Sequence, residues 1–154
     1  MDNVIIKFIK SHKDAILPTK AHEGDNCFDL YAVEDTVIPG SKCGIVDEVN
    51  IGNAVVPVGI TVGYISEGFG FVLRPKSGLG FKAGLQPHLG EIDNGYRGDC
   101  GVKMYNLTSK NYTFKKGDKV AQIKIEKIYN TNIEWTEVVE EAQRGDAGFG
   151  SSGK

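Results

Sequence analysis

The sequence predicts an all-β fold, a barrel or sandwich built from short strands. Apolar residues recur mainly at every second position, which is the pattern of a half-buried strand. Twenty glycines and five prolines interrupt these runs. No window keeps an apolar helical stripe for about three turns, so helices are expected to be few and short.

Four alternating runs mark the expected strands, in chain order: Val4, Ile6 and Phe8; Ile60, Val62 and Tyr64; Val102 and Met104; and Ile123 and Ile125, with Lys124 and Glu126 on the other face. A short helix is expected after Ser77. Turns are expected at Pro39-Gly40, Asn94-Gly95 and Lys116-Gly117-Asp118, because these residues favour tight reversals. The Asn94-Gly95 pair is typical of a hairpin tip.

Length points to one domain, and charge does not favour nucleic acid as a partner. A chain of 154 residues has the size of a single domain. We expect a β body over residues 1–143 and, in the same domain, a flexible glycine-rich lid over residues 144–154. The formal net charge of -2 gives no excess of basic residues, so nucleic acid is not an expected partner.

No membrane anchor or redox site is expected. The apolar run at the N-terminus is too short for a signal peptide, and no stretch has the length of a membrane-spanning helix. Cys27, Cys43 and Cys100 are widely spaced and form no CxxC pair, so we expect reduced, unligated thiols. The expected location is the cytoplasm or another reducing compartment, which is the host cytoplasm if the source is viral.

The segment PKSGLG at residues 75–80 is a candidate phosphate loop. Small residues let backbone N–H groups approach a ligand, and the start of a helix favours an anion. The alternative is a tight turn without a ligand, which is the commoner use of such a segment.

The segment GEIDNGYRGD at residues 90–99 places a carboxylate, an aromatic ring and a guanidinium around one turn. Asp93 could accept a proton from an attacking water, and an aromatic ring beside it suits a nucleoside. The alternative is that Asp93 only closes the turn with its side chain.

Two further segments are candidates. RGDAGFGSSG at residues 144–153 has the cation, mobile glycines, aromatic ring and hydroxyls that a lid over a triphosphate needs, although a disordered tail is the alternative. Asp29 is a candidate to hold Mg²⁺ directly or through water, because Mg²⁺ prefers oxygen ligands and keeps several waters. A solvent-facing strand aspartate is the alternative there.

Taken together and in order, these segments resemble the five motifs of the homotrimeric dUTPase family from about Ala21 to the C-terminus. The motifs correspond to residues 21–32 (AHEGDNCFDLYA), 75–84 (PKSGLGFKAG), 90–99 (GEIDNGYRGD), 117–122 (GDKVAQ) and 144–153 (RGDAGFGSSG), and VPVGI at residues 56–60 precedes the second. The resemblance implies a jelly-roll-like β fold and a homotrimer whose active sites are shared between subunits. It also implies hydrolysis of dUTP to dUMP and pyrophosphate with Mg²⁺.

The resemblance implies a role for each site residue. Asp93 would activate the attacking water and Tyr96 would pack on the deoxyribose. The backbone of the third motif, including Gly90 and Ile92, would read uracil. Lys76, Ser77 and Gly78 would contact the phosphates, with Ser77 and Gly78 on the β-phosphate, while Gln122 would bind the α-phosphate and Arg144 the γ-phosphate. In the lid, Phe149 would stack over the base, with Gly150 and Ser151 beside it. Asp29 would meet Mg²⁺ through water.

Two positions depart from the family pattern. Lys76 stands where the family usually has Arg, which replaces a bidentate fork with a point charge. Ala147 stands where the fifth motif usually has Gly, and Ala resists a positive φ.

The rival interpretations of the function are a dCTP deaminase, which would release ammonia, a catalytically silent nucleotide-binding regulator, and a structural β-sandwich with no ligand.

Overall fold

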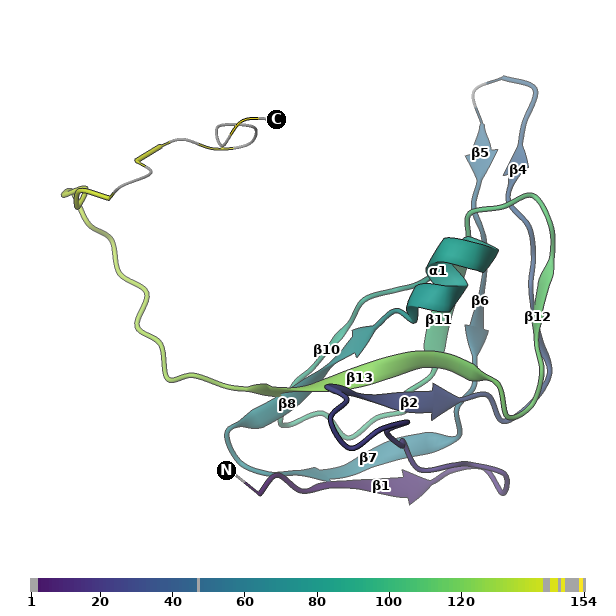
Figure 1. The fold of residues 1–154 in the computed structure, drawn as a ribbon, viewed down its shortest axis with the longest axis horizontal. Helices are drawn as coiled ribbons and strands as arrows, with labels where there is room; N and C mark the ends of the chain where they lie inside the picture. Colours follow the sequence, from purple (N-terminus) through teal and green to yellow (C-terminus); the bar gives the residue numbers. More distant parts are fainter. Residues whose placement is uncertain (1–2, 47, 143–144, 147, 149–152, 154) are drawn as a thin grey trace.

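The computed structural model describes residues 3–46, 48–142, 145–146, 148 and 153. Its secondary structure is almost entirely β, with one short helix among the described residues (Figure 1). In chain order the elements are β1 (Ile6–Lys10), β2 (Cys27–Tyr31), β3 (Thr36–Ile38), β4 (Lys42–Cys43), β5 (Val49–Asn50), β6 (Gly52–Val56), β7 (Ile60–Ile65), β8 (Phe69–Arg74), α1 (Ser77–Ala83), β9 (Leu85–Pro87), β10 (Glu91–Ile92), β11 (Val102–Asn106), β12 (Tyr112–Phe114) and β13 (Lys119–Lys127). The all-β prediction and the short helix after Ser77 are confirmed.

The strands pair in several small sheets. The largest has the order β10-β8-β13-β2, and a second has the order β6-β11-β9. β1 pairs with β7, β12 with β3, and β4 with β5. All named pairs are antiparallel, and over the described residues the ladders do not close into a barrel.

Alternation along the strands builds the core between these sheets. In β11, Val102 and Met104 are fully buried while Lys103 between them is exposed. In β7 the alternation buries Ile60 and Val62, but the register with β1 shifts beyond Val62, and Tyr64 is exposed while Ile65 is buried. The apolar side chains that line one face of each strand therefore meet in a single cluster, as a period of two requires.

Two details of the sequence prediction are wrong. β1 begins at Ile6, so Val4 lies before the strand and not inside it. A turn does form at Asn94-Gly95, where the N–H of Tyr96 donates to the carbonyl of Asp93 over 3.0 Å. The strands on either side of it do not pair with each other, however, because β10 pairs with β8 and β11 pairs with β6 and β9.

Two segments project from the body. The β4–β5 hairpin extends at one end, and residues 128–142, which we call the C-terminal arm, lead away from the end of β13 (Figure 1). The arm carries apolar side chains among glutamates, and Trp135 and Val139 are fully or almost fully exposed. Neither projection was predicted from the sequence.

The three cysteines are free thiols, as expected. Burial, with a smaller contribution from Asp99, raises the pKa of Cys100 to about 12. Within the described residues, no helix is both long enough and apolar enough to cross a membrane.

Candidate functional site

The predicted phosphate loop lies where β8 ends and α1 begins. Lys76 is the N-cap residue, with extended backbone at φ -94° and ψ 127°, and its carbonyl accepts from the N–H groups of Leu79 and Gly80. Ser77 and Gly78 form the first turn and are exposed. N–H groups in a first turn have no carbonyl one turn earlier to bind. No side chain caps this helix and its first turn holds no acidic residue, so an anion meets no competitor there.

Gln122 lies at the centre of the adjoining sheet. It is paired across β13 with Arg74 of β8 on one side and with Asp29 of β2 on the other. Its Nε2 donates to the carbonyl of Pro75 over 2.9 Å. The structure thus brings together four residues that the sequence predicted separately: Asp29, Lys76, Ser77 and Gln122.

Asp29 is bound by two lysines. It is 5% exposed, with Lys76 Nζ 2.5 Å from Oδ1 and Lys119 Nζ 2.7 Å from Oδ2. Sequence reasoning missed Lys119, because in a regular strand it would lie on the opposite face from Gln122. The β13 register shifts between Lys119 and Ala121, and such a bulge re-aims side chains.

The two lysines determine the charge of this carboxyl group. Burial would raise the pKa of Asp29, but the hydrogen bonds from Lys119 and Lys76 outweigh it and the pKa is lowered. The same hydrogen bond from Lys119 raises the pKa of that lysine. The carboxylate of Asp29 and the ammonium group of Lys119 are therefore both charged at neutral pH.

These contacts limit how Asp29 can meet a metal. Both of its oxygens already accept from ammonium groups, and among the described residues no three His, Cys, Asp or Glu side chains gather into a metal site. Each carboxylate oxygen has a second lone pair. The geometry therefore fits an outer contact through water with Mg²⁺ that arrives on a ligand, and does not fit a protein cage.

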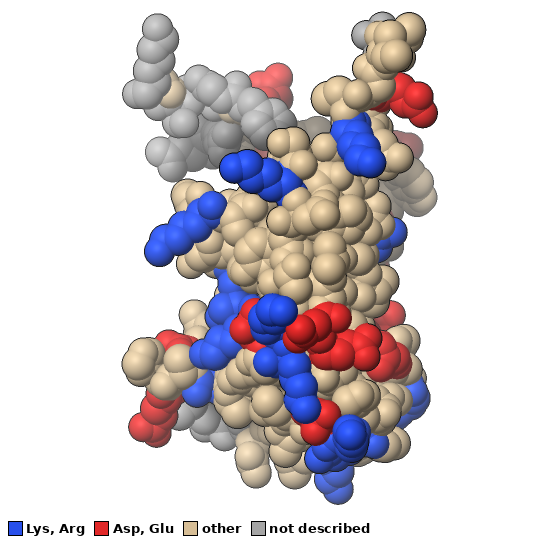
Figure 2. Space-filling model, turned by 90° about the vertical axis from the view of Figure 1, so that its right-hand side faces the viewer, with Lys and Arg blue, Asp and Glu red and all other residues tan. Residues whose placement is uncertain are grey.

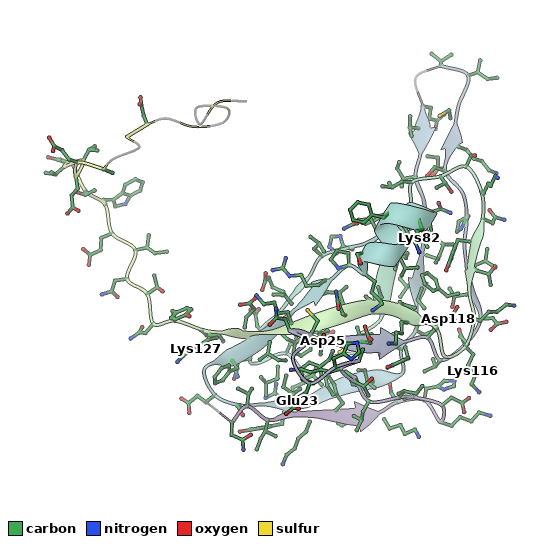
Figure 3. The ribbon with its side chains drawn as sticks, in the orientation of Figure 1. Glu23, Asp25, Lys82, Lys116, Asp118 and Lys127 are labelled. Atoms are coloured by element: carbon green, nitrogen blue, oxygen red, sulfur yellow. The ribbon has the colours of Figure 1, made fainter. Side chains whose placement is uncertain are left out.

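Other charges surround this region without forming a uniform basic surface. Glu23 and Asp25 lie on the loop before β2, and Lys82 lies in the last turn of α1 (Figure 3). On the face shown in Figure 2, basic and acidic side chains lie side by side. The ion pairs Lys115–Asp35 and Lys116–Asp14 are of this mixed kind.

Residues 90–99, which we call the Asp93 loop, form the second half of the site. Asp93 is exposed at the turn. The Tyr96 hydroxyl donates to the carbonyl of Asp99 over 2.7 Å, and its ring lies against Gly98, where a Cβ would overlap the phenol. Gly98 is therefore required for the orientation of Tyr96.

Gly90 and Ile92 lie on the inner side of this loop. The Gly90 carbonyl accepts from the N–H of Leu73 over 2.9 Å, and Ile92 pairs with Phe71. Both line a small cleft of about 140 Å³ together with Asp99 and residues on β8, β11 and β13. The cleft lies where the two sides of the loop separate, and a planar ring could meet backbone groups there.

Within one chain the two halves of the site are far apart. Ile92 pairs with Phe71, and β10 runs from there toward Gly70, whereas Gln122 pairs with Arg74 at the other end of β8. Four residues of strand correspond to roughly 13 Å. A general base must lie about 3 Å from the proton it takes, or act through one water. Asp93 therefore lies beyond hydrogen-bond reach of the phosphate loop of its own chain.

The predicted lid residues Arg144, Phe149, Gly150 and Ser151 lie outside the described residues, as does the departure at Ala147.

Comparison with known proteins gives a consistent result. A family model described as dUTPase matches residues 13–153. A deoxyuridine 5'-triphosphate nucleotidohydrolase of Clostridium tetani is 38% identical over 97% of this chain and 95% of its own length. The enzyme of the same name from Paramecium bursaria Chlorella virus 1 is 33% identical, covering 99% of each chain.

Solved structures share the fold. A variant of the Staphylococcus bacteriophage 80alpha dUTPase with dUpNHpp matches with a TM-score of 0.80 at 24% identity, over 97% of this chain and 99% of the other. A variant dUTPase from phage phi11 of S. aureus, described as showing the coordination of a structural Mg(II) ion, matches with a TM-score of 0.72 at 22% identity, over 89% and 99% of the two chains.

Proposed function

The chain belongs to the dUTPase family and is a dUTP diphosphatase, and from this premise we propose how its residues carry out the reaction. The observation that carries the proposal is the β13 register, which places Asp29 and Arg74 on either side of Gln122, beside the loop that begins α1. A triphosphate needs cations and donors such as Arg74, Gln122 and the backbone N–H groups that begin α1, because its transition state is stabilised mainly by positioned charge.

Asp93 acts as the general base. Its carboxylate takes a proton from a water molecule whose oxygen bonds to the α-phosphorus. The bond from the α-phosphorus to the oxygen bridging to the β-phosphate breaks, and pyrophosphate leaves with that oxygen. Asp93 is exposed on its loop, so a nucleotide can approach it. A positioned base contributes about a hundred- to ten-thousandfold in rate.

The Asp93 loop selects the nucleoside. Tyr96 packs on the deoxyribose, where a ribose 2′-hydroxyl would collide with the ring. The backbone around Gly90 and Ile92 reads uracil in the small cleft, which leaves no room for a 5-methyl group. The orientation of Tyr96, held by Asp99 and by the absence of a Cβ at Gly98, supports this assignment.

The phosphate loop and the tail hold the triphosphate. Ser77 and Gly78 bind the β-phosphate, Gln122 binds the α-phosphate, and Lys76 supplies a positive charge beside them. Residues 144–154 close as a lid over the body formed by residues 1–143, with Arg144 on the γ-phosphate, Phe149 over the uracil, and Gly150 and Ser151 beside it. Mg²⁺ bound to the phosphates would neutralise their charge and meet Asp29 through water.

The active enzyme is a homotrimer with shared sites. The distance between Asp93 and the phosphate loop in one chain supports this, because a second copy must bring its Asp93 loop to the first. Apolar surface supports it too. The C-terminal arm exposes Ile133, Trp135 and Val139, and an apolar groove of about 550 Å³ lies between β1, β13 and residues 17–20. Unpaired apolar surface of this kind marks an interface.

In the cell, the reaction limits uracil incorporation into DNA and supplies dUMP for dTMP synthesis. We place the protein in the cytoplasm or another reducing compartment, since all three of its thiols are free.

The test is pyrophosphate release with Mg²⁺ from dUTP, dCTP, dTTP and UTP, offered separately to the wild type and to Asp93→Asn. We expect turnover of dUTP alone, and a loss of about a hundred- to ten-thousandfold in the variant. Binding of dUMP should survive in the variant, which separates loss of the base from loss of the fold. Ammonia release from dCTP would support a deaminase instead, and nucleotide binding without any product would support a regulator.

A further inference from the structure

The side chain of Asn94 reaches away from the turn that it helps to form. Its Nδ2 lies 2.8 Å from the carbonyl oxygen of Ser66, 2.8 Å from that of Phe69 and 3.4 Å from that of Ile65. An amide nitrogen carries two hydrogens, so the two shorter contacts account for both donors. Asn94 therefore joins the Asp93 loop to the β7–β8 turn, which is far from it in sequence.

The β7–β8 turn is itself firmly held. The N–H of Ser66 donates to the carbonyl of Ile5 over 2.9 Å, and the Ser66 hydroxyl oxygen accepts from the N–H of Ile5 over 2.8 Å. The N–H of Phe69 closes the turn on the carbonyl of Ser66. An anchor on this turn is consequently an anchor on the β1–β7–β8 framework.

The tip of the Asp93 loop, residues 93–98, needs such an anchor. On its entry side the ladder between β10 and β8 consists of Glu91 and Ile92. On its exit side, the carbonyl of Gly98 accepts from the N–H of Val62 over 3.0 Å. Between these points, the Arg97 guanidinium contacts only carbonyls of the tip itself, those of Asn94 and Tyr96, in the hydrogen bonds of the described residues. Those contacts stiffen the tip without attaching it to the body.

We propose that Asn94 is a positioning residue for dUTP hydrolysis: its amide fixes the tip that carries Asp93 and Tyr96, and so sets both the rate of water activation and the preference for deoxyribose. This rests on the proposed roles of those two residues. A shift of about 1 Å in a catalytic group can cost about a hundredfold in rate. Because one anchor serves both residues, its loss reduces rate and sugar selectivity together.

The decisive variant is Asn94→Asp, which keeps the shape of the side chain. It replaces two donors with acceptors that face three carbonyl oxygens, so the contact becomes repulsive. Asn94→Ser, which keeps one hydroxyl donor, should lie between this variant and the wild type. Asn53→Asp is the matched control, because Asn53 is exposed on β6 and, in the described contacts, its amide donates only to the nearby carbonyl of Ile51.

Three measurements test the proposal on the assembled enzyme: kcat/KM for dUTP and for UTP, thermal unfolding, and amide hydrogen exchange by peptide. For Asn94→Asp we expect kcat/KM for dUTP to fall by about a hundredfold. The preference for dUTP over UTP should narrow, and exchange should accelerate in residues 93–98 but not in the β13 peptide. Asn53→Asp should leave all three unchanged.

Two results would overturn the inference. One is an Asn94→Asp enzyme with the kinetics of the control. The other is a loss of rate without a change in sugar preference or in exchange of residues 93–98, since a merely destabilised fold would do that. If the wild type itself released no pyrophosphate from dUTP, the proposed function would fail, while the exchange measurement would still decide whether Asn94 holds the tip.

Discussion

Lys119 and Gln122 lie three positions apart on β13, yet both side chains lie on the face of the sheet that carries Asp29. Lys119 Nζ is 2.7 Å from Asp29 Oδ2, and Gln122 is the direct cross-strand partner of Asp29. Residues three apart on a regular strand point to opposite faces. The irregular register between Lys119 and Ala121 removes that difference, so the bulge is what completes the charged network beside the phosphate loop.

Replacing Asp29 with Asn should destabilise the fold in a pH-dependent way. The variant loses the charged acceptor of two lysines in a nearly buried position, and we expect a loss of about 1–3 kcal/mol in unfolding free energy at pH 7. Because the folded-state pKa of Asp29 is lowered, the stabilisation is present above the unfolded value and is lost as the pH falls through the folded value. Urea unfolding at pH 7 and below about pH 4 measures the difference.

The control for this experiment is Glu126→Gln, which removes the partly exposed carboxylate paired with Lys124. Surface pairs contribute little, so this variant should unfold almost as the wild type does at both pH values. A gap between Asp29→Asn and the wild type that stayed constant down to low pH would contradict the charge-based explanation.

Adding one methyl group at Gly98 should weaken sugar discrimination. The new Cβ would overlap the Tyr96 phenol, so the ring must move and release the carbonyl of Asp99. We expect Gly98→Ala to raise UTP turnover relative to dUTP by about tenfold, in the range that one lost contact produces. Gly95→Ala is the matched control on the same loop, because a Cβ there meets nothing within 4 Å. Equal UTP to dUTP ratios in the two variants would remove Tyr96 from the selection of the sugar.

Mixing inactive chains should restore activity if sites are shared. The Asp93→Asn chain lacks the general base, and the Gln122→Ala chain lacks the α-phosphate ligand. In the proposed trimer, the Asp93 and the Gln122 that serve one site come from different chains. Unfolding the two together and refolding them should give dUTP turnover above the sum of the separate variants.

The control mixture combines Asp93→Asn with Tyr96→Ala. Both residues lie on the same loop, so no arrangement of these chains unites an intact base with an intact sugar contact, and no restoration is expected. Equal turnover in the two mixtures would rule out the sharing of sites between chains.

Changing Lys76 to Arg should strengthen nucleotide binding. Lys76 offers a point charge that is already 2.5 Å from Asp29, whereas a guanidinium can bind the carboxylate and keep donors for a phosphate. We expect a fall of several-fold in KM for dUTP with little change in kcat, and the opposite for Lys76→Met. Steady-state kinetics with Mg²⁺ measures both, and unchanged KM in Lys76→Met would show that this charge does not contact the substrate.

The strands that the sequence predicted best are those with one buried face. Val102 and Met104, or Ile123 and its neighbours, alternate because the core demands it. The β4–β5 hairpin has two-residue strands with exposed residues, so no alternation reveals it. The C-terminal arm has no core of its own to impose a pattern.

The residues of the site also differ in how far the sequence reveals them. Asp93, Ser77 and Gln122 stand at positions to which the motifs give a role. Lys119 and Asn94 lie within the same motifs, but the contact of Lys119 depends on a bulge and that of Asn94 on carbonyls that lie more than twenty residues earlier in the chain. Neither relationship leaves a local signal. The sequence therefore offers candidates for the groups that do the chemistry, whereas the groups that hold them emerge only from the structure.

The course of the C-terminal arm also makes the chain vulnerable to proteolysis. Residues 128–142 are extended and exposed, and every residue of the fifth motif follows them. Exposed, extended backbone is what a protease needs, and no core contact of the body depends on this segment. One cut in this arm would thus remove every residue of the fifth motif while leaving the core of the body intact.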